Sequence, residues 1–237
     1  MYSAEKHSSG QRSLGFPANV MTRIETSLPH AKRRQSGFSL LEMVMVMAIA
    51  IVAASVTFIS LQPVLKQQRV TNSYNIVLSA MRQARDNAIA QRAAYTVTFN
   101  TGAVPHTIRI EPTFAGFQGA LAPTTFSLPN DVRLDNEPGI PTNNLFVPDR
   151  FGTGANAVDF GYTGQGVGVG GANVLYFCPD GSAQDSPQCT GNVNNGVVYI
   201  ARPGDLYSSR AITLWGATGR VRGWRLYNSG GATWQRQ

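Results

Sequence analysis

Cysteine and histidine are scarce in this sequence, and charged residues are few. The 237 residues include two cysteines and three histidines, and charged residues make up 14% of the chain against 43% hydrophobic residues. Two cysteines are too few for a four-cysteine zinc site or for a small domain held together by many disulfides. The low charge and high apolar content exclude a disordered chain and a charged coiled-coil rod.

Motifs of the common catalytic classes are also missing. The chain has no Gly-x-Ser-x-Gly, His-Glu-x-x-His or Cys-x-x-Cys sequence. The glycine-rich stretch 161–171 lacks the preceding strand and following helix that a phosphate-binding loop needs. Asp131, Asp135 and Glu137 lack the spacing of a calcium loop, so a solvated turn is favoured there. We expect no enzyme, no cofactor and no metal, and we place His106 at the surface.

Glycine and proline are missing from one part of the chain and abundant in another. Between Phe38 and Thr101 there is no glycine and one proline, Pro63, whereas Gly102–Gln237 contains 21 glycines and 10 prolines. The first stretch predicts one long helix, and the second predicts short strands joined by turns. The expected fold class is α+β, with the long helix packed on antiparallel β-sheet.

The start of the long helix is strongly apolar. Met43–Leu61 carries no charge, and 16 of its 19 residues are apolar, which is enough to span a bilayer core of about 30 Å. A secretory signal peptide would be cut after such a run, but here a basic cluster at 32–34 and a lone Gly37 stand before it. Glu42 lies inside the apolar segment, and a carboxylate deep in a bilayer costs about 2.5–3.5 kcal/mol. A plain membrane anchor would not carry this charge, so we expect a partner for it.

The sequence Gly37-Phe38-Ser39-Leu40-Leu41-Glu42, followed by the apolar run, resembles the processing site of type IV pilins and pseudopilins. The resemblance implies that a prepilin peptidase cuts between Gly37 and Phe38 and methylates the new N-terminus of Phe38. It also implies that Glu42, the fifth residue of the mature chain, pairs with the N-terminal amine of a neighbouring subunit. The implied partners are other pilin or pseudopilin subunits, the prepilin peptidase, the inner membrane and its assembly platform.

The helix is predicted to continue beyond the membrane span to about Arg92. Apolar residues recur there at steps of three and four, and Pro63 is expected to kink or loosen the helix. We predict a leader at 1–37, a membrane and assembly half of the helix at 38–62, an amphipathic half at 63–93, and a β-rich domain at 94–237. The basic residues at 32–34 favour a cytoplasmic leader, which places the β-rich domain in the periplasm. Met1 and Met21 both remain open as start sites.

Eight strands are predicted in the β-rich domain, with a hairpin joining the first two. They are 95–99, 107–110, 125–128, 132–134, 174–178, 197–200, 211–215 and 220–227. Cys178 and Cys189 are either two buried thiols or a disulfide, and the expected location outside the cytoplasm favours the disulfide. Such a bridge would contribute about 3 kcal/mol.

Positive charge is concentrated at the C-terminal end, where residues 201–237 hold six arginines and one acid, Asp205. On a strand, Arg220 and Arg222 point to the same face. A bulge at Gly223 is expected to bring Arg225 onto that face and to turn Trp224 into the core. Several guanidinium groups on one edge are suited to binding phosphates. The alternative is a solvated sheet edge that charge protects from pairing.

The mature chain resembles the GspH/FimT branch of pseudopilins and minor pilins, in which a long helix precedes a β-rich domain ending in a Gly-Arg strand. The sequence Gly219-Arg220-Val221-Arg222 is similar to the DNA-binding motif of the FimT side, which acts in natural transformation. The resemblance implies a minor structural subunit that serves type II protein secretion or a type IV pilus. The alternative that it implies is a minor pilin that binds DNA through Arg220, Arg222 and Arg225.

Overall fold

The computed structural model describes residues 37–114, 121–142, 146–152, 156–161 and 173–237. The predicted leader, apart from Gly37, and the glycine-rich stretch after Gly161 lie outside the described residues. The chain divides into two compact units, residues 1–50 and 51–237, and the packing below is that of the second unit. Its elements are α1 (Leu40–Gln91, shared with the first unit), β1 (Tyr95–Asn100), β2 (Thr107–Pro112), β3 (Thr124–Ser127), the 3₁₀ turn η1 (Pro148–Arg150), β4 (Val158–Gly161), β5 (Val174–Phe177), β6 (Ala183–Gln184), β7 (Asn195–Arg202), β8 (Asp205–Trp215), β9 (Arg220–Asn228) and β10 (Ala232–Arg236).

Helix α1 is continuous over 52 residues, as the lack of glycine predicts. In the described part of the chain it is long and apolar enough to cross a membrane, with a mean hydropathy of 2.5 over eighteen residues that are not buried. Pro63 lies inside the helix without breaking it. A proline lacks the backbone N–H donor and so removes one helical hydrogen bond. The helix continues on both sides of Pro63.

The second half of α1 buries one stripe against the β-strands. Its buried residues recur at three- and four-residue steps, which is the predicted helical period. They are Val70, Ser73, Tyr74, Val77, Ala80, Met81, Ala84 and Ala88. The three alanines let the helix backbone approach the sheets closely, and the whole stripe apart from Ser73 joins one hydrophobic core with residues of both sheets.

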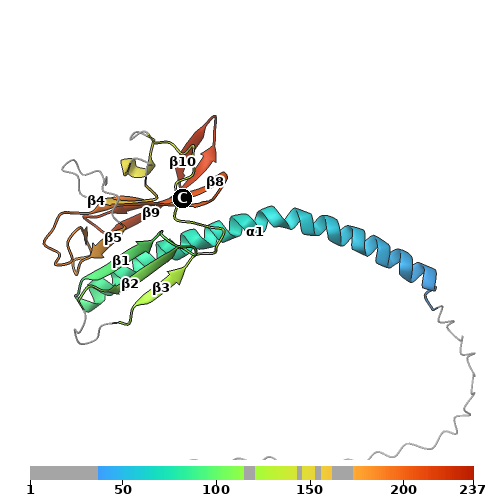
Figure 1. Cartoon of the computed structure of the whole chain (residues 1–237), viewed down its shortest axis with the longest axis horizontal. Helices are drawn as coiled ribbons and strands as arrows, with labels where there is room; N and C mark the ends of the chain where they lie inside the picture. The colour runs from blue at the N-terminus through green and yellow to red at the C-terminus, as the bar shows by residue number, and fades with distance from the viewer. Residues whose placement is uncertain (1–36, 115–120, 143–145, 153–155, 162–172) are drawn as a thin grey trace, which may run out of the picture. The chain divides into compact units, whose positions relative to one another are not determined.

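The strands form two antiparallel five-stranded sheets, with the orders β3-β2-β1-β5-β6 and β10-β9-β8-β7-β4. The predicted first hairpin is present: Tyr95 in β1 lies opposite Pro112 in β2, and Asn100 lies opposite Thr107. Figure 1 shows β1, β2 and β3 alongside the second half of α1, with β8, β9 and β10 in the other sheet. The architecture is therefore the predicted α+β one, with a helix packed on antiparallel sheet.

Seven of the eight predicted strands correspond to observed ones, and the strand predicted at 132–134 is wrong. Arg133 forms only an isolated bridge with Ala201. The prediction omitted β4, β6 and β10. The two cysteines are joined, with Cys178 Sγ and Cys189 Sγ 2.04 Å apart, and they close a loop just after β5.

Candidate functional site

The predicted processing site lies directly before α1. Gly37 and Phe38 are not helical, and 76% of Phe38 is exposed. The first turn closes with the Met43 backbone N–H donating to the Ser39 carbonyl oxygen at 3.1 Å. Glu42 is the acidic residue of this first turn, where the helix dipole favours a negative charge. The bond between Gly37 and Phe38 is therefore in exposed chain outside the helix, four residues before the carboxylate.

The first half of α1 presents exposed apolar side chains. From Phe38 to Leu65 the large hydrophobic residues are all exposed. Across the described residues no hydrogen bond or ion pair involves the Glu42 side chain. A surface of this size has to be covered by lipid or by other protein.

The region from 32 to 58 matches the family model described as the prokaryotic N-terminal methylation motif. This chain is a type IV pilin-like protein. The match covers the processing site and most of the apolar run, and it does not extend into the globular domain. Comparison with curated proteins and with solved structures gave no match. The pilin-like assignment therefore rests on the N-terminal segment together with the α+β architecture.

The C-terminal strand of this pilin-like protein differs from the prediction at Gly223. The pairing of β8 with β9 runs without a shift from Arg210 opposite Arg225 to Trp215 opposite Arg220, so no bulge forms. A Cβ atom at Gly223 would lie 1.6 Å from the Tyr74 hydroxyl oxygen. The glycine is thus needed for the close approach of α1. Because the alternation is unbroken, Arg220 and Arg222 share one face with Trp224, and Arg225 lies on the other face.

Arg222 is engaged within the fold. Its Nη1 lies 2.9 Å from Asp149 Oδ1, its side chain is 23% exposed, and its guanidinium stacks 5.1 Å from the centre of the Trp215 ring. Asp149 Oδ2 also accepts hydrogen bonds from Thr213 Oγ1 at 2.5 Å and from Trp215 Nε1 at 3.1 Å. Arg222 therefore holds the segment around η1 against the outer face of its sheet, and its charge is balanced by Asp149.

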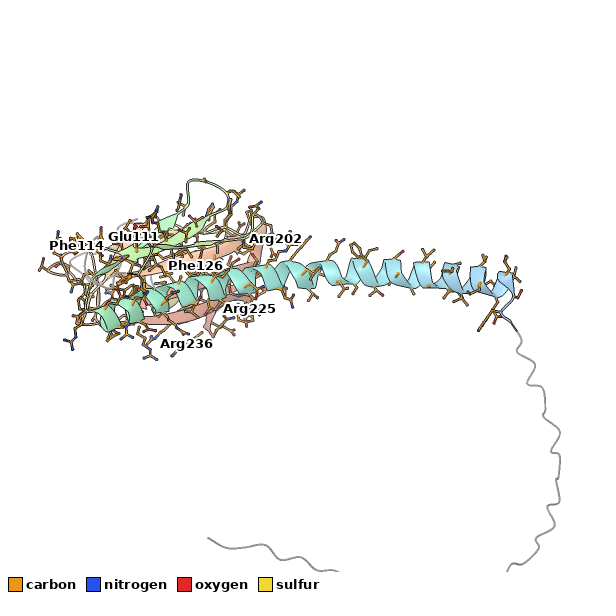
Figure 2. The ribbon with its side chains drawn as sticks, turned by 90° about the horizontal axis from the view of Figure 1, so that it is seen from below. Glu111, Phe114, Phe126, Arg202, Arg225 and Arg236 are labelled. Carbon is orange, nitrogen blue, oxygen red and sulfur yellow. A yellow bond between two sulfur atoms is a disulfide. The ribbon has the colours of Figure 1, made fainter. Side chains whose placement is uncertain are left out.

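Arg225 belongs to a separate cluster. It stacks 5.0 Å from the centre of the Tyr227 ring and lies opposite Arg210, which is only 3% exposed. Burial, followed by the charge of Arg225, lowers the pKa of Arg210 to about 10. Figure 2 shows Arg225 and Arg236 on one side of the α1 ribbon and Phe126, from the other sheet, on the opposite side.

Arg220 is exposed and borders a groove of about 660 Å³ between α1 and the start of β9. The groove is lined by residues of the helix, of the turn between β8 and β9, and of both strands. They are Arg82, Arg85, Asp86, Trp215, Thr218, Gly219, Arg220, Val221 and Arg222. The sequence prediction did not include Arg82 and Arg85, although their spacing of three residues places both on one side of the helix.

Three segments meet at the end of this groove. The Arg85 Nε donates a hydrogen bond to the Gly181 carbonyl oxygen at 3.2 Å, within the loop that the disulfide closes. Gly219 has a positive φ of 61°, and a Cβ atom there would lie 2.1 Å from the same Gly181 oxygen. The glycine before Arg220 is therefore required by the turn and by close packing, whatever the arginines bind.

The remaining candidate residues have structural roles. His106 is only 6% exposed, and its Nδ1 accepts a hydrogen bond from the Leu134 backbone N–H at 3.1 Å, so the predicted surface position is wrong. Glu137 is buried and accepts from the Gly204 backbone N–H at 2.9 Å. Asp131 pairs with Arg69 at 3.0 Å. In the described ranges no group of three possible metal ligands occurs.

Proposed function

We propose that this pilin-like protein is a minor structural subunit of a type IV-filament machine and not an enzyme. A prepilin peptidase cuts between Gly37 and Phe38 and methylates Phe38, and the first half of α1 then carries the subunit into a pseudopilus or a pilus. The observation that supports this most directly is the methylation motif at 32–58, which covers most of an exposed apolar helix half. The GspH/FimT branch, with service in type II secretion or a type IV pilus, is part of the proposal.

The charge of Glu42 gives the proposal a physical basis. A carboxylate within lipid costs about 2.5–3.5 kcal/mol. Two opposite unit charges 4 Å apart gain about 4 kcal/mol at an effective dielectric of 20. Pairing of Glu42 with the free amine of a neighbouring processed subunit therefore offsets the cost, whereas a lone subunit retains it. The pairing favours entry into a filament over residence in the membrane.

The proposal also assigns a location before assembly. The basic residues at 32–34 hold the leader in the cytoplasm, so the helix crosses the inner membrane once and the globular domain lies in the periplasm. An oxidising compartment suits the bridge between Cys178 and Cys189. The assembly platform of the inner membrane would then extract the processed subunit.

The test is incorporation of a Glu42→Gln variant into filaments, in cells that carry the machine. Glutamine keeps the size of the side chain and removes the charge, so we expect processing at Gly37 to continue. Incorporation into filaments is expected to fall by at least about tenfold, which corresponds to a free-energy change of about 1.4 kcal/mol. Met43→Ala, one residue away and also exposed, is the matched control and is expected to assemble. Normal incorporation of Glu42→Gln would contradict the proposed pairing.

A second candidate function is DNA binding during natural transformation. It is favoured by the groove beside the Gly219-Arg220 turn, which four arginines and one acid line. The sequence resemblance assigns the phosphate contacts to Arg220, Arg222 and Arg225, and the proposal keeps arginine contacts at this end of the chain. Each neutralised phosphate of duplex DNA contributes about 0.9 to the log–log dependence of binding on salt, so three contacts predict a slope near −2.7. Failure of the processed, detergent-solubilised protein to retain duplex DNA at low salt would exclude this function.

A further inference from the structure

We propose that the phosphates of DNA are bound in the groove between α1 and β9. Arg82 and Arg85 from the helix bind them together with Arg220 from the strand. Arg222 and Arg225 then do not make the decisive contacts. This inference rests on the second candidate function, DNA binding. It places the DNA-contacting surface in the groove between α1 and β9 instead of on one face of β9.

The charges along the groove favour an anion there. Its lining contains the guanidinium groups of Arg82, Arg85, Arg220 and Arg222 against one carboxylate, Asp86. Asp149 already neutralises Arg222. Arg82 and Arg220 are exposed, and no salt bridge of the described chain involves either of them. Three cations therefore face one acid in a groove that is open to solvent, which is a surface that attracts a polyanion.

The strand edge at the start of β9 is unpaired. In the described sheet β10 pairs with β9 from Trp224 to Asn228, and the Gly223 carbonyl oxygen accepts a hydrogen bond from the Gln237 backbone N–H at 3.0 Å. Residues 220–222 have β8 on one side and no strand on the other. Some backbone N–H groups of such an edge point away from the paired strand. Backbone donors of this kind contact phosphate oxygens in many complexes with DNA, so they add to the three guanidinium groups.

The helical wall of the groove is held in place by the rest of the fold. Met81 and Ala84, which flank the two arginines on α1, are fully buried. The hydrogen bond from Arg85 Nε to the Gly181 oxygen fixes that side chain near the turn, and Gly219 packs against the same atoms. A preformed wall reduces the ordering cost of binding, because fewer side chains lose freedom when the ligand enters.

Arg225 is poorly placed to share this ligand. It lies five positions after Arg220, which is roughly 17 Å along a strand. It also lies on the other face of β9, beside Arg210 and the Tyr227 ring. A phosphate group at Arg220 would therefore be beyond direct reach of Arg225.

The experiment compares three forms of the full-length processed protein in detergent, by fluorescence anisotropy with a labelled short DNA duplex across a salt series. They are the wild type, Arg82→Gln/Arg85→Gln, and the charge-matched control Arg225→Gln/Arg236→Gln. We expect the helix variant to reduce the log–log salt slope by about 1.8, two phosphate contacts' worth, and the control to leave it within about 0.5 of wild type. Thermal unfolding of each variant checks that the fold is retained.

If the wild-type protein binds DNA and Arg82→Gln/Arg85→Gln shows the same salt slope, the proposed phosphate site in the groove is contradicted. DNA binding itself would then remain. An equal loss in both double variants would also contradict this site, because binding would then follow net charge alone. Absence of binding by the wild type at low salt would remove the candidate function and the groove together. A single Arg220→Gln variant is expected to lower the slope by about 0.9, which tests the strand side of the groove separately.

Discussion

The two halves of α1 have the same helical geometry but differ in how their apolar side chains are buried. In the second half, residues such as Val77 and Met81 are fully buried by the two sheets of the same chain. In the first half, comparable residues such as Met47 and Ile51 are more than 60% exposed. The comparison teaches that the second half is stabilised by the fold of the subunit. The first half depends on lipid or on other subunits for its burial.

Truncating one methionine in each half gives the largest expected contrast. Met81→Ala removes a side chain with no exposed surface, and we expect the free energy of unfolding to fall by about 2–5 kcal/mol. Met47→Ala, at a site that is 63% exposed, is expected to change it by less than about 0.5 kcal/mol. Chemical denaturation of the full chain in detergent, followed by circular dichroism, measures both. Similar losses in the two variants would mean that the halves do not differ in this way.

Opening the disulfide should weaken the globular half alone. Cys178 and Cys189 are 11 residues apart, and release of a loop of this size lowers stability by about 3 kcal/mol in the chain-entropy model. Cys178→Ser/Cys189→Ser, compared with the oxidised wild type by thermal unfolding, measures the effect. We also expect weaker DNA binding by this variant, because Gly181, which orients Arg85, lies inside the loop. Unaltered unfolding would show that the loop is held by its hydrogen bonds instead.

Adding a methyl group at Gly223 tests how closely the helix lies on its sheet. Its Cβ would approach the Tyr74 hydroxyl within 1.6 Å, and we expect Gly223→Ala to cost about 1–3 kcal/mol. Tyr74→Phe removes the nearest atom and should recover part of the loss. Gly102→Ala is a matched control, because its nearest neighbour is 3.6 Å away. An equal cost of Gly223→Ala with and without the Tyr74 hydroxyl would place the strain elsewhere.

The smallest expected effect is a dependence on pH that comes from the β-rich half. Burial, followed by the nearby charge of Arg133, lowers the pKa of His106, and Asp135 opposes this in part. The unfolded chain, with a His pKa of about 6.5, therefore takes up a proton before the folded protein does. The contribution to stability is present above pH 6.5 and is lost as the pH falls below that value. His106→Gln should flatten this part of the pH profile of unfolding, and an unchanged profile would assign it to other groups.

The elements that could be predicted are those whose signal is local. The long helix followed from missing glycine and a three-four period of apolar residues, and the processing site is a contiguous motif, Gly37 to Glu42. The strand β6 has only two residues, and β4 includes the buried Asp159. Neither shows the alternation of a half-buried strand.

The candidate groove could not be predicted because it is assembled across the chain. Arg82 and Arg220 are far apart in sequence, and only the packing of α1 along β9 brings them to one groove. Gly223 had two physical explanations, a bulge or a close approach, and the position of Tyr74 decides between them. Similarly, the acid that neutralises Arg222 comes from η1, which no local pattern connects to β9.

The account depends most on removal of the leader at one bond. Full-length protein should be co-expressed with an active prepilin peptidase, purified from membranes, and examined by intact mass and N-terminal sequencing. We predict a mature chain that begins with N-methylated Phe38, and a Gly37→Leu variant that keeps its leader because the bulky side chain blocks the peptidase. A wild-type chain that still carries residues before Phe38 when the peptidase processes another prepilin in the same cells would contradict the account.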